Sequence, residues 1–148
     1  AQAAGSGDIP VAPEKVVDVG GTITSLAVGQ DLDAPIIALG SWLAAEDGGT
    51  LHLLSAPNLE VRAVIEAGPV LGVAMADINR DGSDEILVGT QDGYLRAFNL
   101  QGQKVLEWAV GDFQLAENGA IFAYDDGEKI VVAFAVAGGF RVLAIGDE

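Results

Sequence analysis

Oxygen-bearing side chains gather in one nine-residue stretch of the chain, Asp77 to Glu85, which reads DINRDGSDE. Carboxylate and amide side chains stand at the odd positions 1, 3, 5 and 9 of the stretch, and Gly82 stands at position 6, where it permits the left-handed backbone of a tight reversal. Carboxylate, amide and carbonyl oxygens are the ligands of hard cations, and calcium accepts roughly six to eight of them in irregular geometry. The stretch therefore predicts a Ca²⁺ site. Its expected ligands are Asp77, Asn79, Asp81, Ser83 (through the backbone carbonyl) and Glu85.

The stretch begins like an EF-hand loop but departs from that motif in two ways. Position 12 is Val88 and not glutamate, and the residues from Ile86 to Val88 have the pattern of a strand and not of a helix. Asp84, between two expected ligands, is expected to face solvent. The alternative to a metal site is an acidic turn without an ion, in which the carboxylates accept hydrogen bonds from backbone N–H groups. A bound ion would instead become part of the folding free energy.

Short apolar runs separated by Gly, Asp, Asn and Pro fill the chain from residue 16 onward, and such runs are strand signals. The runs repeat. Gly49, Gly93 and Gly139 each begin a similar segment, at separations of 44 and 46 residues, and two apolar runs precede each of them. The expected strands are 22–29, 36–40, 49–55 and 60–65, then 69–77, 85–89, 93–99 and 104–110, then 119–126, 129–134 and 139–145.

Units of four strands with a period near 45 residues are typical of propeller blades. The predicted fold is all-β, with about three propeller-type blades of four antiparallel strands at residues 16–66, 67–111 and 112–148, after a flexible or extended arm at 1–15. The third unit lacks its fourth strand because the sequence stops at Glu148. An evenly spaced β-sandwich is the alternative. The only helix-like stretch, Ser41 to Glu46, is expected to be a loop.

The middle unit carries a family resemblance over residues 68 to 110. Its segment DINRDGSDEILVG resembles the FG-GAP repeat of integrin alpha-subunit propellers and of the related VCBS repeats in bacterial secreted proteins. The following segment, GTQDGYLRAFNLQGQKVLEW, is similar to the blade repeat of PQQ-type and BamB-like propellers. The resemblance implies a calcium-binding blade and a Trp108 side chain packed between blades. It carries metal ligation to the middle unit alone, because the first unit keeps Asp31 and Asp33 without the glycine and the third has a shortened turn, YDDGEKI.

The charge balance is strongly acidic: 7 Lys and Arg stand against 22 Asp and Glu, for a net charge of −15. Such a surface repels nucleic-acid phosphates and anionic membranes, so neither is an expected partner. The absence of cysteine excludes disulfides, thiolate zinc sites and cysteine nucleophiles. No apolar run reaches about 18 residues, so membrane insertion is not expected. The small residues at the start suggest the mature end of an exported, extracytoplasmic protein, or else an arbitrary chain boundary.

Catalytic groups are scarce in this sequence, and we expect no enzyme activity. His52 is the single histidine, and no serine has a nucleophile-elbow context. His52, Arg96 and Arg141 occupy matching positions of the third strand in each unit, so they are expected to line one sheet face and to meet acidic neighbours on adjacent blades. Trp42 lies in the irregular insert of the first unit, as a contact point or as core.

Three blades do not close a ring, since propellers have about 4–8. The expected partners are therefore other protein chains. Two copies would form a six-bladed homo-oligomer, copies would associate head to tail in a fibre, or the chain would be a piece of a longer protein. The predicted function is a non-enzymatic, calcium-stabilised propeller module for protein interaction or extracellular assembly. The alternatives are a quinoprotein-like or lyase-type propeller domain of an enzyme and a self-assembling filament subunit.

Overall fold

Alternating apolar residues and glycine-rich turns fold the described chain into eleven β-strands without a helix. The computed structural model describes residues 9–10, 12, 16–18, 22–43, 48–56, 58–109, 121–136 and 138–146; at positions 42 and 43 only the backbone is described. Among these residues there is no helix long and apolar enough to cross a membrane.

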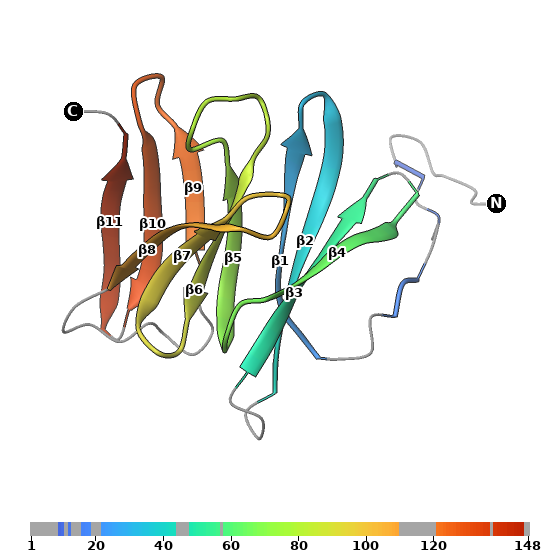
Figure 1. Cartoon of the computed structure of the whole chain (residues 1–148), viewed down its shortest axis with the longest axis horizontal. Coiled ribbons are helices and arrows are strands. Elements are labelled where there is room, and N and C mark those ends of the chain that lie inside the picture. The colour runs from blue at the N-terminus through green and yellow to red at the C-terminus, as the bar shows by residue number, and fades with distance from the viewer. Residues whose placement is uncertain are drawn as a thin grey trace.

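The strands form three antiparallel sheets, each built from consecutive hairpins (Figure 1). Sheet 1 contains β1 (Ile23–Asp31), β2 (Ala34–Leu43), β3 (Gly48–Ser55) and β4 (Glu60–Glu66) in that order. Sheet 2 contains β5 (Val70–Ala76), β6 (Glu85–Thr90), β7 (Tyr94–Phe98) and β8 (Lys104–Ala109). Sheet 3 contains β9 (Ile121–Asp125), β10 (Ile130–Val136) and β11 (Gly139–Ile145). The predicted all-β fold of about three blades is confirmed.

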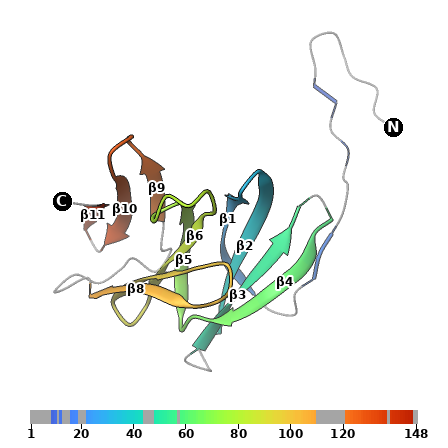
Figure 2. The ribbon, with the colours of Figure 1, turned by 45° about the horizontal axis from the view of Figure 1, so that its top comes forward.

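The sheets stand side by side in chain order, as Figures 1 and 2 show from two directions. Their first strands lie next to one another, with β5 between β1 and β9. We call the face of a sheet that points toward the next sheet in the chain its forward face, and the opposite one its back face. Sheet 2 is covered on both faces, which explains why β5 and β6 are almost continuously apolar.

Two apolar clusters fill the junctions between the sheets. At the first junction, Leu51 and Leu53 on the forward face of sheet 1 share a cluster with Val73, Ile86 and Val88 on the back face of sheet 2. At the second junction, the forward face of sheet 2 packs against the back face of sheet 3. The members of that cluster include Leu87, Leu95, Ala97, Ile121, Val132 and Phe134. The same strands of sheet 2 contribute side chains to both clusters, because successive side chains along a strand point to opposite faces.

Some predictions are corrected or lie outside the described residues. Ser41 to Leu43 continue β2 and are not a loop, because they pair in register with Gly48–Thr50 of β3. Residues 16–18, counted among the strand-like runs, belong to no strand. The Trp42 side chain, most of the predicted arm at 1–15, and residues 44–47 and 110–120 lie outside the described residues. Trp108 does pack between sheets: its ring meets Phe134 of sheet 3 edge-on, with centroids 6.4 Å apart.

Candidate metal site

The acidic stretch forms the connection between β5 and β6, at one end of sheet 2. Arg80 and Gly82 adopt left-handed backbone conformations, with φ of 61° and 94°, and these two residues turn the chain back on itself. The turn brings Asp77, Asp81 and Glu85 together: one carboxylate oxygen of each lies within 4.8 Å of the others. The sequence places these three residues four apart, and the reversal converts that spacing into a cluster.

Backbone N–H groups hold the cluster's oxygens in place. The two Asp77 oxygens accept hydrogen bonds from Asp81 N (3.1 Å) and Gly82 N (2.8 Å). Asn79 Oδ1 accepts from Asp81 N at 3.2 Å, and Asp81 Oδ1 accepts from Ser83 N at 2.9 Å. Such Asx-type turns are the contacts expected of an acidic turn without an ion, and they also pre-arrange oxygen ligands. The clustered ligand atoms are all oxygens, so the chemistry of these residues fits a hard cation such as calcium.

Glu85 is the buried member of the cluster, with only 2% of its surface exposed. Its Oε1 accepts hydrogen bonds from the N–H groups of Ile78 (2.9 Å) and Asn79 (3.4 Å). Burial raises the pKa of Glu85, and the negative charges of Asp81 and Asp77 act in the same direction. A carboxylate that is buried among other carboxylates is stabilised in its charged form by a nearby cation.

The side chains of two residues of the stretch contact sheet 1. The Ser83 hydroxyl donates to Asp31 Oδ1 at 2.8 Å, and Ser83 forms an isolated bridge with Asp31. The expectation that Asp84 faces solvent is wrong. Asp84 is half-buried, its Oδ2 accepts a hydrogen bond from Gln30 N at 2.9 Å, and burial raises its pKa. The reason is tertiary: the end of β1 lies directly beside this loop.

The loop is joined to both neighbouring sheets. On the side of sheet 1, Leu32 N donates to Gly82 O at 3.0 Å. On the side of sheet 3, the Arg80 guanidinium pairs with Asp125 at the end of β9, with Nη2 2.9 Å from Oδ1. This ion pair, together with the N–H of Gly127, lowers the pKa of Asp125 to about 2. The loop that carries the candidate metal site therefore links sheet 2 to both of its neighbours.

The sequence reasoning missed Arg80 and Asp84 as contacts between sheets. One signal for Arg80 was available, because it is the only basic residue in a stretch that is otherwise acidic, and a cation there needs an anionic partner. Asp84 carried no comparable signal, since its acceptor role depends on a strand 54 residues earlier in the chain.

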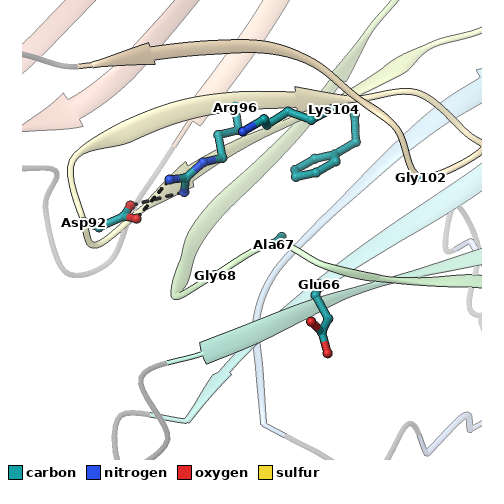
Figure 3. A pocket seen from close by; sticks show the side chains of 8 residues that line it. Glu66, Ala67, Gly68, Asp92, Arg96, Gly102 and Lys104 are labelled. Carbon is teal, nitrogen blue, oxygen red and sulfur yellow. Dashed lines mark hydrogen bonds and ion pairs between the residues drawn. The ribbon is translucent and has the colours of Figure 1, made fainter.

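A hollow separate from the acidic loop lies between sheets 1 and 2, where β4 leads into β5. This hollow has a volume of about 380 Å³, and Glu66, Asp92, Arg96 and Lys104 are among its lining residues. Figure 3 shows the Arg96 guanidinium paired with Asp92, while the Glu66 carboxylate lies away from it. Arg96 Nε also donates to Glu107 at 2.8 Å, so the donors of this cation already have partners. The hollow does not have the unpaired basic character of an anion site.

His52, Arg96 and Arg141 all lie on the back faces of their sheets, as the strand registers require. The expectation that they meet acidic groups of adjacent blades is wrong for Arg96. Its partners Asp92 and Glu107 belong to its own sheet, because Glu107 of β8 pairs directly across from Arg96 and Asp92 lies in the β6–β7 turn four residues before it. His52 Nδ1 is buried and forms no hydrogen bond with any described residue.

Comparison with solved structures identifies the architecture. The crystal structure of BBS1N in complex with ARL6DN, soaked with mercury, matches 88% of this chain with a TM-score of 0.63 and 18% sequence identity. A lead-soaked crystal of the same complex matches 86% of the chain with a TM-score of 0.61, also at 18% identity. BBS1N is a β-propeller chain. The three sheets have a β-propeller-type fold.

The match is one of fold and not of family. The chain spans 41% and 36% of the lengths of the two BBS1N chains. The Dos1 propeller superposes with a TM-score of 0.37 and 10% identity, which is too low to bear on the fold. No protein-family model matches the sequence, and no curated protein matches it.

Proposed function

We propose that the chain is a non-enzymatic, calcium-stabilised β-propeller module that presents surfaces to other protein chains. The observation that carries this proposal is the position of the acidic loop. Its three converging carboxylates lie at the point where the loop also bonds to sheets 1 and 3. An ion held there would fix the loop and, through it, the relative positions of the three sheets.

Calcium is the ion that these ligands favour. Asp77, Asp81 and Glu85 would each contribute a carboxylate oxygen, Asn79 an amide oxygen and Ser83 its carbonyl. Partly exposed sites of extracellular modules bind calcium with dissociation constants of about 10⁻⁴–10⁻³ M. This range suits an extracytoplasmic location, where calcium is abundant, and an FG-GAP or VCBS-type repeat of a secreted protein.

A role in protein interaction is supported by the fold and by the chain's open surfaces. BBS1N, to which the chain is similar in fold, was crystallised in complex with ARL6DN. In this chain the outermost faces of sheets 1 and 3 expose large apolar side chains, among them Val28 (64% exposed) and Phe140 (72% exposed). Exposed apolar patches of this kind are typical of protein–protein contacts. Completion of the propeller by further chains is part of the proposal.

The alternative of a quinoprotein-like or lyase-type domain requires a funnel of basic or aromatic groups for a cofactor or a polyanion. Four of the basic side chains, Arg62, Arg80, Arg96 and Lys104, are engaged in ion pairs with carboxylates. This pairing favours the non-enzymatic role. An absorbance scan for a bound quinone in the purified protein would detect the enzyme alternative directly.

The decisive experiment is thermal unfolding with added calcium and with a chelator. We expect calcium to raise the Tm. At a concentration 100-fold above the dissociation constant, binding adds about 2.7 kcal/mol to the free energy of unfolding. The double substitution Asp77→Ala and Asp81→Ala should abolish the calcium-dependent rise. Asp126→Ala, in the acidic turn of sheet 3, is the matched control and should keep it. If calcium leaves the Tm of the unsubstituted protein unchanged, the loop is an acidic turn and the calcium part of the proposal is wrong.

A further inference from the structure

Strand register defines equivalent positions in the three sheets. His52, Arg96 and Arg141 lie on the third strands of their sheets. Each pairs with a residue of the second strand, and its side chain lies on the back face. The residues on either side of these three point to the forward face, because side chains alternate along a strand. The equivalent forward positions are therefore Leu51, Leu95 and Phe140 on one side, and Leu53, Ala97 and Val142 on the other.

These equivalent positions differ sharply in exposure. Leu51 and Leu95 are 0% and 2% exposed, because the next sheet covers them, whereas Phe140 is 72% exposed. On the first strand of sheet 3, Phe122 is 68% exposed, and it lies in the same cross-strand row as Ala133 and Val142. The forward face of sheet 3 thus carries the apolar side chains of an inter-sheet junction, with an apolar hollow of about 280 Å³ among them.

The back face of sheet 1 has the complementary property. Leu26 and Val73 occupy equivalent positions on the first strands. Leu26 pairs with the residue of β2 that pairs with His52, and Val73 pairs with the residue of β6 that pairs with Arg96. Val73 is 3% exposed at the first junction, and Leu26 is 61% exposed. Two cross-strand rows form this face: Leu26, Leu39, His52 and Val64, and Val28, Ile37, Leu54 and Val61. All members except His52 are apolar. The outer members Leu26, Val28, Val61 and Val64 are each more than half exposed, whereas Leu54 in the middle is buried.

We propose that the forward face of sheet 3 is a docking surface for the back face of sheet 1 of a second copy of this chain. The contact would continue the two junctions inside the chain, each of which joins a forward face to a back face. This docking contact specifies the surface and the partner of the protein-interaction module proposed above, and it rests on that proposed function. One chain offers both halves of the contact, so two copies can cover all four open faces. A ring of six sheets lies within the range of about 4–8 for propellers.

The net charge sets a condition on this association. Each copy carries −15, so two copies repel each other at low ionic strength. Salt screens that repulsion over a Debye length of about 8 Å at physiological ionic strength. We expect association to strengthen as salt rises, because apolar burial drives it and long-range charge opposes it.

The test is the molar mass of the full chain by light scattering, over a range of protein concentrations, with calcium and physiological salt. We expect a mass above that of the monomer. Phe140→Glu blocks the forward face, and Val28→Glu blocks the back face. Each variant alone should be monomeric, because every contact needs one face of each kind. An equimolar mixture of the two should form a heterodimer through the one intact pair of faces. Val105→Glu, at a 50% exposed position of β8, is the matched control and should associate normally.

Several results would overturn the proposal. An unsubstituted chain that stays monomeric at all concentrations would do so, and so would a single variant that still dimerises, since that indicates like faces in contact. A mixture that stays monomeric would exclude the complementary pairing. Far-UV circular dichroism of each variant checks that the fold is intact. If the chain is monomeric while calcium still raises its Tm, the docking surface is wrong and the calcium-stabilised module stands. If it dimerises without responding to calcium, the reverse holds.

Discussion

Asp84 and Gln30 belong to different sheets and hold each other at two points. The Asp84 carboxylate accepts a hydrogen bond from Gln30 N at 2.9 Å, and Asp84 N donates to Gln30 O at 2.8 Å. The acidic loop of sheet 2 is thereby hydrogen-bonded to the end of β1, the edge strand of sheet 1. Gly29 allows this approach, because a Cβ at that position would lie 2.5 Å from Asp84 Oδ2.

The first prediction concerns this contact. Asp84→Ala removes the acceptor for Gln30 N and should lower the free energy of unfolding by about 0.5–1.5 kcal/mol. Asp84→Asn keeps an acceptor oxygen and removes a charge that burial disfavours, so it should lose less. Urea unfolding at neutral pH measures both. Equal losses in the two variants would mean that the hydrogen bond to Gln30 contributes nothing.

The second prediction separates the structural role of Glu85 from a role as calcium ligand. Glu85→Gln keeps an oxygen that can accept from Ile78 N and removes a buried charge. Without calcium, its free energy of unfolding should equal or exceed that of the unsubstituted protein. With calcium, its rise in Tm should be clearly smaller, because one charged ligand is gone. Paired melting curves with calcium and with a chelator give both quantities; an undiminished calcium response would remove Glu85 from the ligand set.

The third prediction concerns the ion pair between Arg80 and Asp125. Arg80 holds the pKa of Asp125 at about 2, below its ordinary value of 3.8. A depressed folded-state pKa contributes stability above the unfolded-state pKa, and that contribution is lost as pH falls from about 4 toward 2. In Arg80→Met, the pKa of Asp125 should rise toward 3.8. NMR titration of the side-chain carboxyl measures it, with Arg62→Met as the matched control, which should leave Asp125 unchanged. A pKa that stays near 2 in Arg80→Met would assign the shift to the Gly127 N–H alone.

The fourth prediction uses two equivalent positions. Leu51→Ala opens a cavity at the first junction and should lower the free energy of unfolding by about 2–5 kcal/mol. Phe140→Ala, at the equivalent position of sheet 3, should cost the monomer much less, because 72% of that side chain is already exposed. Chemical denaturation at low protein concentration measures both values. A comparable loss in the two variants would show that Phe140 is packed within the chain.

The fifth prediction concerns two glycines near the start of the third strand of their sheets, Gly49 of β3 and Gly139 of β11. A Cβ at Gly49 would lie 2.2 Å from Ser41 O and 2.5 Å from Gly68 O, which are backbone atoms that cannot move aside freely. Gly49→Ala should therefore lower the free energy of unfolding by about 1–3 kcal/mol. Gly139→Ala is the matched control: no atom lies within 4 Å of its Cβ, so stability should hardly change. Thermal unfolding of the two variants would contradict this account if Gly139→Ala were the more damaging.

The local pattern of the sequence was sufficient to predict the strands and their grouping into sheets. Runs such as EILVG, ended by a glycine turn, specify strands because the period of two and the turn residues are local properties. The repeat of about 45 residues then specified units of four strands. It did not reveal that Ser41 to Leu43 extend β2, because their pairing with β3 depends on the neighbouring strand and not on their own composition.

The sequence by itself determined the candidate cluster as well, since the spacing of Asp77, Asp81 and Glu85 around Gly82 brings their oxygens together within a single turn. Only the tertiary structure decided what this loop touches and which faces stay open. Asp84 meets Gln30, Arg80 meets Asp125, and Phe140 stays exposed where Leu95 is buried. The physical reason is that hydrogen bonds, ion pairs and burial between sheets depend on the order in which the sheets stack, and no local stretch of sequence encodes that order.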